Sequence, residues 1–276
     1  MSIPAYFDVH THTQFAAYKN DEDAVIRRAL DAGVWMVNVG TQKDTSRAAI
    51  ASAHRYPVGV YAAIGLHPIH TEASYHDAKE LGADDQGFTS RGEEFDYAYY
   101  LDLGKDASVV AIGECGLDYY RLEEKTKDRQ HYAFERQIAL AVALARPLMI
   151  HCRNAFSDLI AALAHAPALP HTPGIVHFFS GTRANATKLL DLGFSFSFGG
   201  VTTFTNAYDE VVRYVPLEHI VLETDAPYVT PVPYRGMRNE PLYVVEVAKK
   251  IGALKGLTAQ EMGLRGVENA RKILDI

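Results

Sequence analysis

Short runs of apolar residues alternate with longer segments of helical periodicity along the whole chain. The apolar runs lie at 5–9, 34–39, 58–64, 109–113, 147–150, 174–178, 194–198 and 219–223. Most of them are apolar at every position, which is typical of parallel strands that are covered on both faces. The repeated alternation predicts a TIM-like (β/α)8 barrel. An open doubly wound sheet is the alternative, because closure of a sheet leaves no signal in a sequence.

The segments between these runs carry the usual signals of helix ends. The first helical segment begins with the acidic pair Asp21-Glu22 and ends at Gly33. The segment 258–272 opens with a capping box formed by Thr258 and Glu261, and it predicts an added terminal helix.

Length and composition fit one α/β domain that spans residues 1–276. Single barrels of this kind commonly have roughly 250 residues, and 48% of this chain is hydrophobic. The stretch 82–106 is acidic and rich in aromatic residues, and we interpret it as a long connection that ends in a helix. The net charge of -7 argues against strong non-specific binding to nucleic acid. It leaves room for a nuclease that holds its substrate weakly, through a few phosphates.

The two cysteines, Cys115 and Cys152, imply no disulfide framework and fit a reducing cytoplasm. We expect both to be small buried residues. The first residues, MSIPAYFDVH, lack the basic start and the long apolar run of a signal peptide. No apolar run approaches the ~20 residues that a membrane-spanning helix needs. The sequence therefore predicts a cytoplasmic protein without membrane contact.

Imidazoles and carboxylates follow five of the eight apolar runs. Because the carboxyl ends of parallel strands meet at one face of a barrel, where such enzymes carry out their chemistry, we expect these side chains to converge. The candidate metal ligands are His10, His12, Glu114, His151, His177 and Asp225.

Nitrogen and oxygen ligands without thiolate suit Zn²⁺, Mn²⁺, Mg²⁺ or iron. The six candidate side chains are too many for one catalytic ion that also binds a water molecule. Two divalent ions, roughly 3.5–4 Å apart and bridged by Glu114, fit the number. Asp225 is then the candidate general base for an activated water. Glu223 lies two residues earlier, on the same side of its strand, and we expect it to orient a ligand.

Six segments resemble the TatD-type metal-dependent deoxyribonucleases of the amidohydrolase superfamily, and the resemblance covers nearly the whole chain. The segments are DVHTH at 8–12, AIGLHP at 63–68, GECGLDYY at 113–120, PLMIHCRNA at 147–155, HFFSGT at 177–182 and LETDAPYVTPVPYRGMRNEP at 222–241. The last is the most specific of them.

The resemblance implies a TIM-like barrel with a divalent-metal centre that acts on DNA phosphodiesters. It implies one ion held by His10, His12, Glu114 and Asp225, and a second ion held by Glu114, His151 and His177. The stretch TQFAAYKND at 13–21 and the long stretch 82–106 depart from the usual family pattern. Both adjoin the expected mouth, so the metal site is better indicated than the substrate.

Several further residues lie after strands and are candidates for substrate contacts. His67 either donates to a phosphate oxygen or is held structurally by Pro68. Guanidinium groups match phosphate geometry, and Arg238 is the preferred candidate, with Glu240 expected to fix its loop. Arg153, Arg183 and Arg235 are the other loop arginines.

Tyr119, Phe179 and Tyr228 are candidates for stacking on bases, and packing at the mouth of the barrel is the alternative for each.

Three functions remain open on the sequence. The first is a metal-dependent phosphodiesterase that trims DNA ends. The second is a hydrolase of a small ester, lactone, amide or aminoacyl ester, which the same pair of ions would serve. The third is a metal-dependent binding module without catalysis, and the complete ligand set argues against it.

Overall fold

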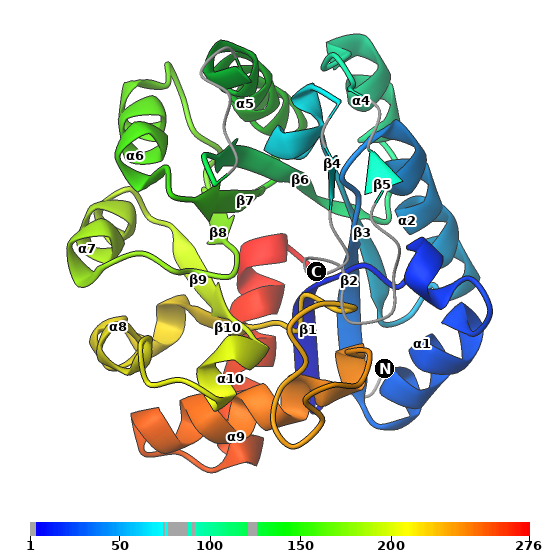
Figure 1. The fold of residues 1–276 in the computed structure, drawn as a ribbon, viewed down its shortest axis with the longest axis vertical. Coiled ribbons are helices and arrows are strands. Elements are labelled where there is room, and N and C mark those ends of the chain that lie inside the picture. Colours follow the sequence, from blue (N-terminus) through cyan, green and yellow to red (C-terminus); the bar gives the residue numbers. More distant parts are fainter. Residues whose placement is uncertain (1–3, 74, 77–87, 90–91, 121–125) are drawn as a thin grey trace.

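The computed structural model of this chain describes residues 4–73, 75–76, 88–89, 92–120 and 126–276. Eight of its strands pair in parallel, and β10 pairs with β1, so that the sheet closes into a barrel (Figure 1). The order around the barrel is β1, β2, β3, β6, β7, β8, β9 and β10. Closure confirms the predicted barrel and excludes the open sheet.

The barrel strands are β1 (Tyr6–Thr11), β2 (Val34–Val39), β3 (Val60–Ile64), β6 (Val109–Asp118), β7 (Leu148–Arg153), β8 (Gly174–Val176), β9 (Ser195–Phe198) and β10 (Ile220–Leu222). Each overlaps one predicted run. The largest difference is β6, which continues through Glu114 to Asp118. Two short strands, β4 (Tyr75–His76) and β5 (Phe88–Thr89), form a separate antiparallel pair.

Helices surround the barrel (Figure 1). They are α1 (Glu22–Asp31), α2 (Lys43–Arg55), α4 (Tyr97–Leu103), α5 (Lys127–Leu144), α6 (Phe156–His165), α7 (Arg183–Asp191), α8 (Asp209–Tyr214), α9 (Val244–Lys255) and α10 (Ala259–Leu274). Short 3-10 helices are η1 (Ala16–Tyr18), η2 (Pro68–Thr71), η4 (Gly200–Thr203), η5 (Leu217–His219) and η6 (Pro241–Tyr243).

The predicted helix ends are found in the structure. Asp21 precedes α1, and Gly33 follows it with a φ of 74°. Thr258 and Glu261 form the predicted capping box at the start of α10. The predicted connection at 82–106 contains α4 near its end, while its residues 82–87 and 90–91 lie outside the described residues.

Apolar side chains form two layers, one between strands and helices and one inside the barrel. The inner layer joins Phe7, Val37 and Met149 of the strands to Val267 and Ile273 of α10. All five are at least nine-tenths buried. Burying a side chain of this size contributes roughly 1.5–3 kcal/mol, so the interior of the barrel is a packed core.

Helix α10 covers the amino-terminal end of the barrel and is seen in red within the ring of strands (Figure 1). Its Gly263 lies against Tyr6 at the start of β1. Its Asn269 donates hydrogen bonds of 2.8 Å to the carbonyls of Leu217 and Ile220, where β10 begins. The carboxyl-terminal end is the other end of the barrel, and there the strands present their polar residues.

A β-bulge in β1 changes which side chains point towards the barrel axis. Asp8 pairs with Met36 of β2, and Thr11 pairs with Asn38, so that β1 has one extra residue between these pairs. Because side chains alternate along a strand, an extra residue reverses the alternation beyond it. His10 lies within this bulge.

A second bulge lies in β6. Ile112 pairs with Leu148 of β7, and Cys115 pairs with Ile150, so that β6 also carries one extra residue. Glu114 lies in this interval. Bulges beside active sites commonly redirect a side chain, and here both of them contain a predicted metal ligand.

Within the described part of the chain, no helix is both long enough and apolar enough to cross a membrane.

Candidate metal centre

Four side chains from three strands form one half of a buried cluster at the carboxyl ends of the strands. Nε2 of His10 lies 3.1 Å from Nε2 of His12 and 3.5 Å from Oε2 of Glu114. Oδ1 of Asp225 lies 3.7 Å from Nε2 of His10 and 3.4 Å from Nε2 of His12. Each of these two imidazole nitrogens therefore lies close to both carboxylates, as expected of side chains that share an ion.

The other oxygen of Glu114 faces a second half of the cluster. Oε1 lies 3.0 Å from Nδ1 of His151 and 2.9 Å from Nε2 of His177. The two imidazole nitrogens lie 3.3 Å apart. Because its two oxygens face different halves, the Glu114 carboxylate has the position of a bridging ligand.

Groups on the far sides of His12 and His177 bear on the orientation of these rings, whereas Nδ1 of His10 has no hydrogen-bond partner among the described residues. Nδ1 of His12 donates to the carbonyl oxygen of Val39 at 2.7 Å, which leaves the Nε2 lone pair for a metal. Nδ1 of His177 lies 3.5 Å from Oε2 of Glu223. Glu223 itself accepts hydrogen bonds from the Phe178 backbone at 2.7 Å and from Ser197 Oγ at 2.6 Å. Glu223 therefore lies beside His177, and its role in orienting that ring stays a prediction.

Asp118 is a site residue that the sequence analysis missed. Its Oδ2 lies 2.9 Å from Nε2 of His151, on the side of the ring away from Glu114. Asp118 is the last residue of β6, and its parallel register partner is Arg153 of β7. Asp118 lies four residues after Glu114, and residues at even spacing on a strand point to the same side. This signal was missed because the predicted strand ended at residue 113, whereas β6 continues to Asp118.

His67 lies beside the bridging carboxylate. Its Nε2 is 3.1 Å from Oε1 of Glu114, and its Nδ1 accepts a hydrogen bond from the backbone of Ile69 at 3.2 Å. The ring is buried, and burial lowers its pKa. A neutral ring that accepts at Nδ1 carries its proton at Nε2 and donates it to Glu114. His67 therefore contacts a candidate ligand, and its expected contact with substrate stays a prediction.

The local electrostatics favour ionised carboxylates beside neutral imidazoles in one half of the centre. Burial acts to raise the pKa of Glu114, but the imidazoles of His67, His177 and His10 outweigh it and hold this pKa well below its usual range. Burial, together with the neighbouring His177, lowers the pKa of His10 to about 4. An ionised Glu114 and a neutral His10 are the forms that bind a metal.

In the other half, carboxylates keep the imidazoles protonated while no cation is bound. Burial opposes protonation of His151, but hydrogen bonds to Asp118 and Glu114 raise its pKa to about 9. The pKa of His177 is also raised, because Glu114 and Glu223 outweigh the effect of burial. A bound metal would displace these protons, since only a neutral imidazole coordinates it.

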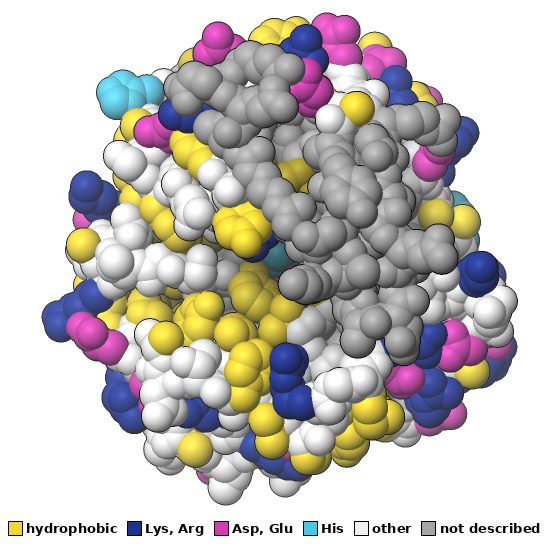
Figure 2. Space-filling view, in the orientation of Figure 1, with side chains coloured by type: hydrophobic (Ala, Val, Ile, Leu, Met, Phe, Trp, Pro, Cys, Tyr) yellow, Lys and Arg dark blue, Asp and Glu magenta, His cyan; other side chains and the backbone are white. Residues whose placement is uncertain are grey.

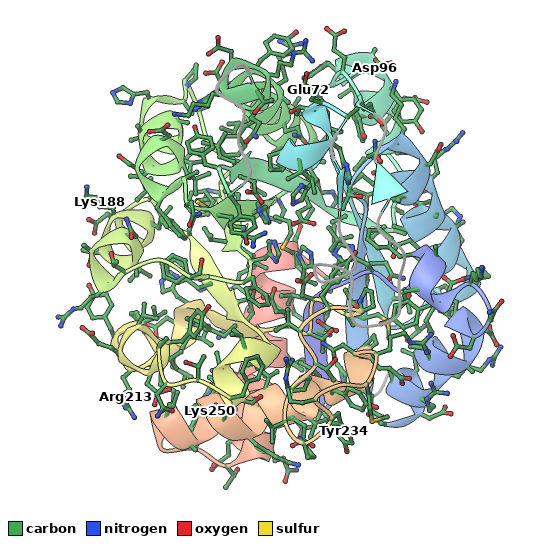
Figure 3. The ribbon with its side chains drawn as sticks, viewed as in Figure 1. Glu72, Asp96, Lys188, Arg213, Tyr234 and Lys250 are labelled. Carbon is green, nitrogen blue, oxygen red and sulfur yellow. The ribbon has the colours of Figure 1, made fainter. Side chains whose placement is uncertain are left out.

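The donor set fits divalent cations. In the part of the chain that the structure describes, no lysine or arginine pairs with Glu114, Glu223 or Asp225. The labelled Lys188, Arg213 and Lys250 lie on the outer helices α7, α8 and α9 (Figure 3). Buried carboxylates need compensating charge, and the buried groups that can hold an ion include His10 with His12 and Glu114.

Comparisons with known proteins agree with this geometry. The model of the TatD related DNase family matches residues 7–275. This chain belongs to the TatD related DNase family. The prediction of a metal-dependent hydrolase of the TatD type is thereby confirmed.

Individual relatives cover almost the whole chain. The chain is 37% identical over 273 residues to the uncharacterized metal-dependent hydrolase YabD of Bacillus subtilis, covering 98% of this chain and 99% of the relative. It is 33% identical over 276 residues to the 3'-5' ssDNA/RNA exonuclease TatD of Erwinia billingiae, covering 97% and 98%. The crystal structure of the TatD homologue YjjV of Escherichia coli matches with a TM-score of 0.85 at 26% identity, covering 100% of both chains.

Arg238, one of the residues predicted to contact substrate, forms hydrogen bonds within the protein. It donates to both carboxylate oxygens of Asp21, at 2.9 and 2.6 Å, and to the carbonyl of Ala17 at 2.7 Å. Its guanidinium also lies over the ring of Tyr18, 4.3 Å from the ring centre. The charge of the Arg238 guanidinium is therefore balanced within the protein, and its contact with a phosphate stays a prediction. Glu240 pairs with Arg28 at 2.9 Å, which agrees with its expected role in fixing the loop.

The aromatic candidates lie in different surroundings. Phe179 is 1% exposed and packs against Phe156 and Phe196, so the expectation that it stacks on bases is wrong. Packing, the alternative stated for Phe179, is what the structure shows. The hydroxyl of Tyr119 bonds to His131 of α5 and Asp158 of α6, at 2.8 and 2.9 Å. Its contacts are therefore with the outer helices.

The ring of Tyr228 lies 6.2 Å from that of His12, which places it beside the cluster. Arg153 lies over the ring of Tyr120, and Arg183 lies over that of Tyr214.

Both cysteines are buried, as predicted, and the sulfur of Cys115 faces the carbonyls of Ile112 and Met149. Burial raises the pKa of the Cys152 thiol to about 12. Neither cysteine belongs to a grouping that could hold a metal among the described residues.

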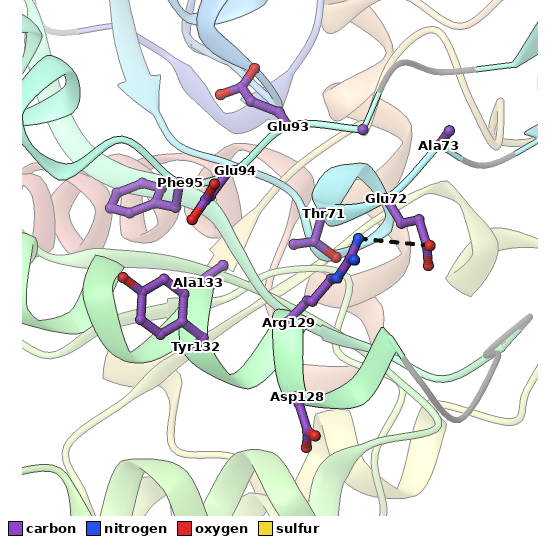
Figure 4. A pocket seen from close by; sticks show the side chains of 11 residues that line it. Thr71, Glu72, Ala73, Glu93, Glu94, Phe95, Asp128, Arg129, Tyr132 and Ala133 are labelled. Carbon is purple, nitrogen blue, oxygen red and sulfur yellow. Dashed lines mark ion pairs between the residues drawn. The ribbon is translucent and has the colours of Figure 1, made fainter.

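A separate cavity of about 550 Å³ lies between η2, the segment 92–95 and the first turns of α5 (Figure 4). Its described lining includes the ion pair of Glu72 and Arg129, with 3.7 Å between the charged groups. None of the predicted metal ligands lines this cavity.

Proposed function

We propose that this chain hydrolyses phosphodiester bonds at the ends of single-stranded DNA. The observation that carries the proposal is Glu114, whose two oxygens face imidazoles from both halves of the cluster. The exonuclease activity on single-stranded nucleic acid that is named for the Erwinia relative supports the choice of substrate.

Two divalent ions, Mg²⁺, Mn²⁺ or Zn²⁺, are the proposed cofactors. His10, His12, Glu114 and Asp225 would hold one ion, which is supported by the short distances from both imidazoles to both carboxylates. The second ion would be held by Glu114, His151 and His177. When bound, such ions neutralise phosphate charge and lower the pKa of water.

The chain's own residues supply the remaining steps. Asp225 is 17% exposed at its side chain, whereas His10 is fully buried, so Asp225 lies on the open side of the centre. Its carboxylate accepts the proton of the attacking water as general base. His67 donates to Glu114 and keeps that carboxylate in place. Asp118 and Glu223 hold the rings of His151 and His177 in the orientation that ligation needs.

We further propose that the chain works as one domain in a reducing cytoplasm and holds its nucleic-acid partner weakly. Two buried thiols and a net charge of -7 support this setting.

The test is degradation of a 5′-labelled single-stranded oligonucleotide with each metal. We expect stepwise shortening with Mg²⁺ or Mn²⁺, its loss in EDTA, and a fall in kcat of at least about 10³-fold in Glu114→Gln. Circular dichroism checks that the variant is folded. Turnover of aryl esters or lactones with intact DNA would instead favour the small-ester hydrolase.

A further inference from the structure

Phe204 and Arg235 form an exposed cationic and aromatic surface on the rim of the barrel. Phe204 follows β9 and η4, and Arg235 lies in the loop after β10, so both come from carboxyl ends of strands. The guanidinium carbon lies 4.1 Å from the centre of the ring. The phenylalanine is 43% exposed, so its ring is accessible to a ligand.

This pair is held in place by its two loops. Nη1 of Arg235 donates to the carbonyl oxygen of Thr230 at 2.7 Å. The backbone of Val232 donates to Oγ1 of Thr203 at 2.9 Å, which ties the loop after β10 to η4. A ligand would therefore meet an arranged surface, with less side-chain freedom to lose on binding.

The charge of Arg235 is not neutralised by the described residues. Among them, no carboxylate forms an ion pair with Arg235, whereas Arg238 and Arg28 pair with Asp21 and Glu240. A guanidinium that lies over an exposed ring and lacks a carboxylate partner among the described residues suits an anion with a planar group.

A second pair of the same kind lies elsewhere on the rim. The guanidinium carbon of Arg153, at the end of β7, lies 3.5 Å from the ring centre of Tyr120, and that ring is 49% exposed. The strand of His177, β8, lies between β7 and β9 in the barrel. The pairs therefore lie on either side of one ligand-bearing strand. Figure 2 shows hydrophobic side chains gathered on this face beside a central hollow.

We propose that Phe204 and Arg235 bind one nucleotide of a single-stranded nucleic acid, with its base stacked on the pair and its phosphate at the guanidinium. Bases stack on aromatic rings and guanidinium planes regardless of sequence. This inference rests on the proposed function, and it adds where the strand lies relative to the metal centre. An acidic peptide would satisfy the charge but not the stacking surface.

The test compares two fluorescein-labelled oligonucleotides of equal length, oligo(dT) and an abasic analogue, by fluorescence anisotropy in EDTA. Phe204→Leu should raise the Kd for oligo(dT) about fivefold or more, because it removes the stacking ring. It should leave the Kd for the abasic strand within about twofold. Arg235→Met should raise both Kd values, because the phosphate contact is common to both strands.

A matched control is available on the outer helices. Arg136 of α5 lies 4.6 Å from the ring centre of Tyr97 of α4. Tyr97→Leu and Arg136→Met remove the same chemistry away from the rim, and they should leave both Kd values unchanged. Wild-type preference for oligo(dT) over the abasic strand is a measurement that does not depend on any variant folding.

The outcomes separate the two proposals. Equal effects of Phe204→Leu on both strands, or no wild-type preference for bases, would overturn the stacking site. Hydrolysis of bis(p-nitrophenyl) phosphate with Mn²⁺ tests the chemistry on a substrate without nucleobases. If that hydrolysis persists while the stacking effect is absent, only the nucleotide site fails. If the stacking effect is present while no phosphodiester is cleaved, only the proposed function fails.

Discussion

Oδ2 of Asp118 lies 2.9 Å from Nε2 of His151, while Nδ1 of the same ring lies 3.0 Å from Glu114. The imidazole is thus held between an outer carboxylate and the centre. This arrangement sets the direction of the nitrogen that would bind metal.

Removing Asp118 should therefore weaken the second ion site. We expect Asp118→Ala to lower the affinity for one of two Mn²⁺ ions by about 10–100-fold, because the ligand ring loses its support. Isothermal titration calorimetry measures this directly. The control is Asp158→Ala, whose carboxylate accepts a hydrogen bond from Tyr119 at 2.9 Å and contacts no candidate ligand. Unchanged affinity in Asp118→Ala would remove Asp118 from the centre.

The two proposed roles of Asp225, metal ligand and general base, can be tested separately. Asparagine keeps one oxygen for coordination but cannot accept the proton of a water. Asp225→Asn should lower kcat on oligo(dT) by about 10²–10⁴-fold. Metal analysis of the purified variant reports whether the ions are retained. A variant that keeps two ions and full kcat would show that the base lies elsewhere.

Arg238 should behave as a structural residue. Its bonds to Asp21 and Ala17 connect the loop after β10 to the segment after β1. Arg238→Met should lower the free energy of unfolding by about 1 kcal/mol, discounted because the pair is partly exposed. The KM for oligo(dT) should stay within about twofold, because the guanidinium is already engaged. A tenfold rise in KM without loss of stability would restore the phosphate contact expected from the sequence.

Asp106 should contribute stability that depends on pH. Burial acts to raise its pKa, but Ser108 donates two hydrogen bonds, of 2.7 and 2.9 Å, and the pKa lies below its usual range. A lowered carboxyl pKa gives stability that is fully present above the unfolded pKa of about 3.9 and is lost as pH falls through the folded pKa.

Asp106→Asn should thus cost about 1 kcal/mol at pH 7, and the difference from wild type should begin to shrink below about pH 4 and vanish only below the lower pKa of the folded state. Urea unfolding at several pH values measures it. A difference that does not shrink as pH falls from about 4 to about 1 would exclude the charge of Asp106 as its cause.

The barrel and the candidate metal ligands could be predicted because their signals are local. The run 34–39 coincides with β2, since a strand buried on both faces is marked by its own residues. His151 and His177 follow apolar runs directly, and their positions after the strands indicate the same face of a parallel barrel.

The remaining features depend on contacts that no local pattern carries. Glu114 reaches the centre through a bulge, which is defined by pairing with β7 and so cannot be read from β6 alone. The partner of Arg238 is Asp21, 217 residues earlier. Phe179 follows a strand, as the ligands do, but tertiary packing places it in the core.

The position of α10 also constrains how a polymer is handled. With that helix packed against the strand starts at one end, a nucleic-acid chain has no route through the barrel axis. Under the proposed function, substrate would enter and product would leave at the carboxyl-terminal face of the barrel, opposite α10.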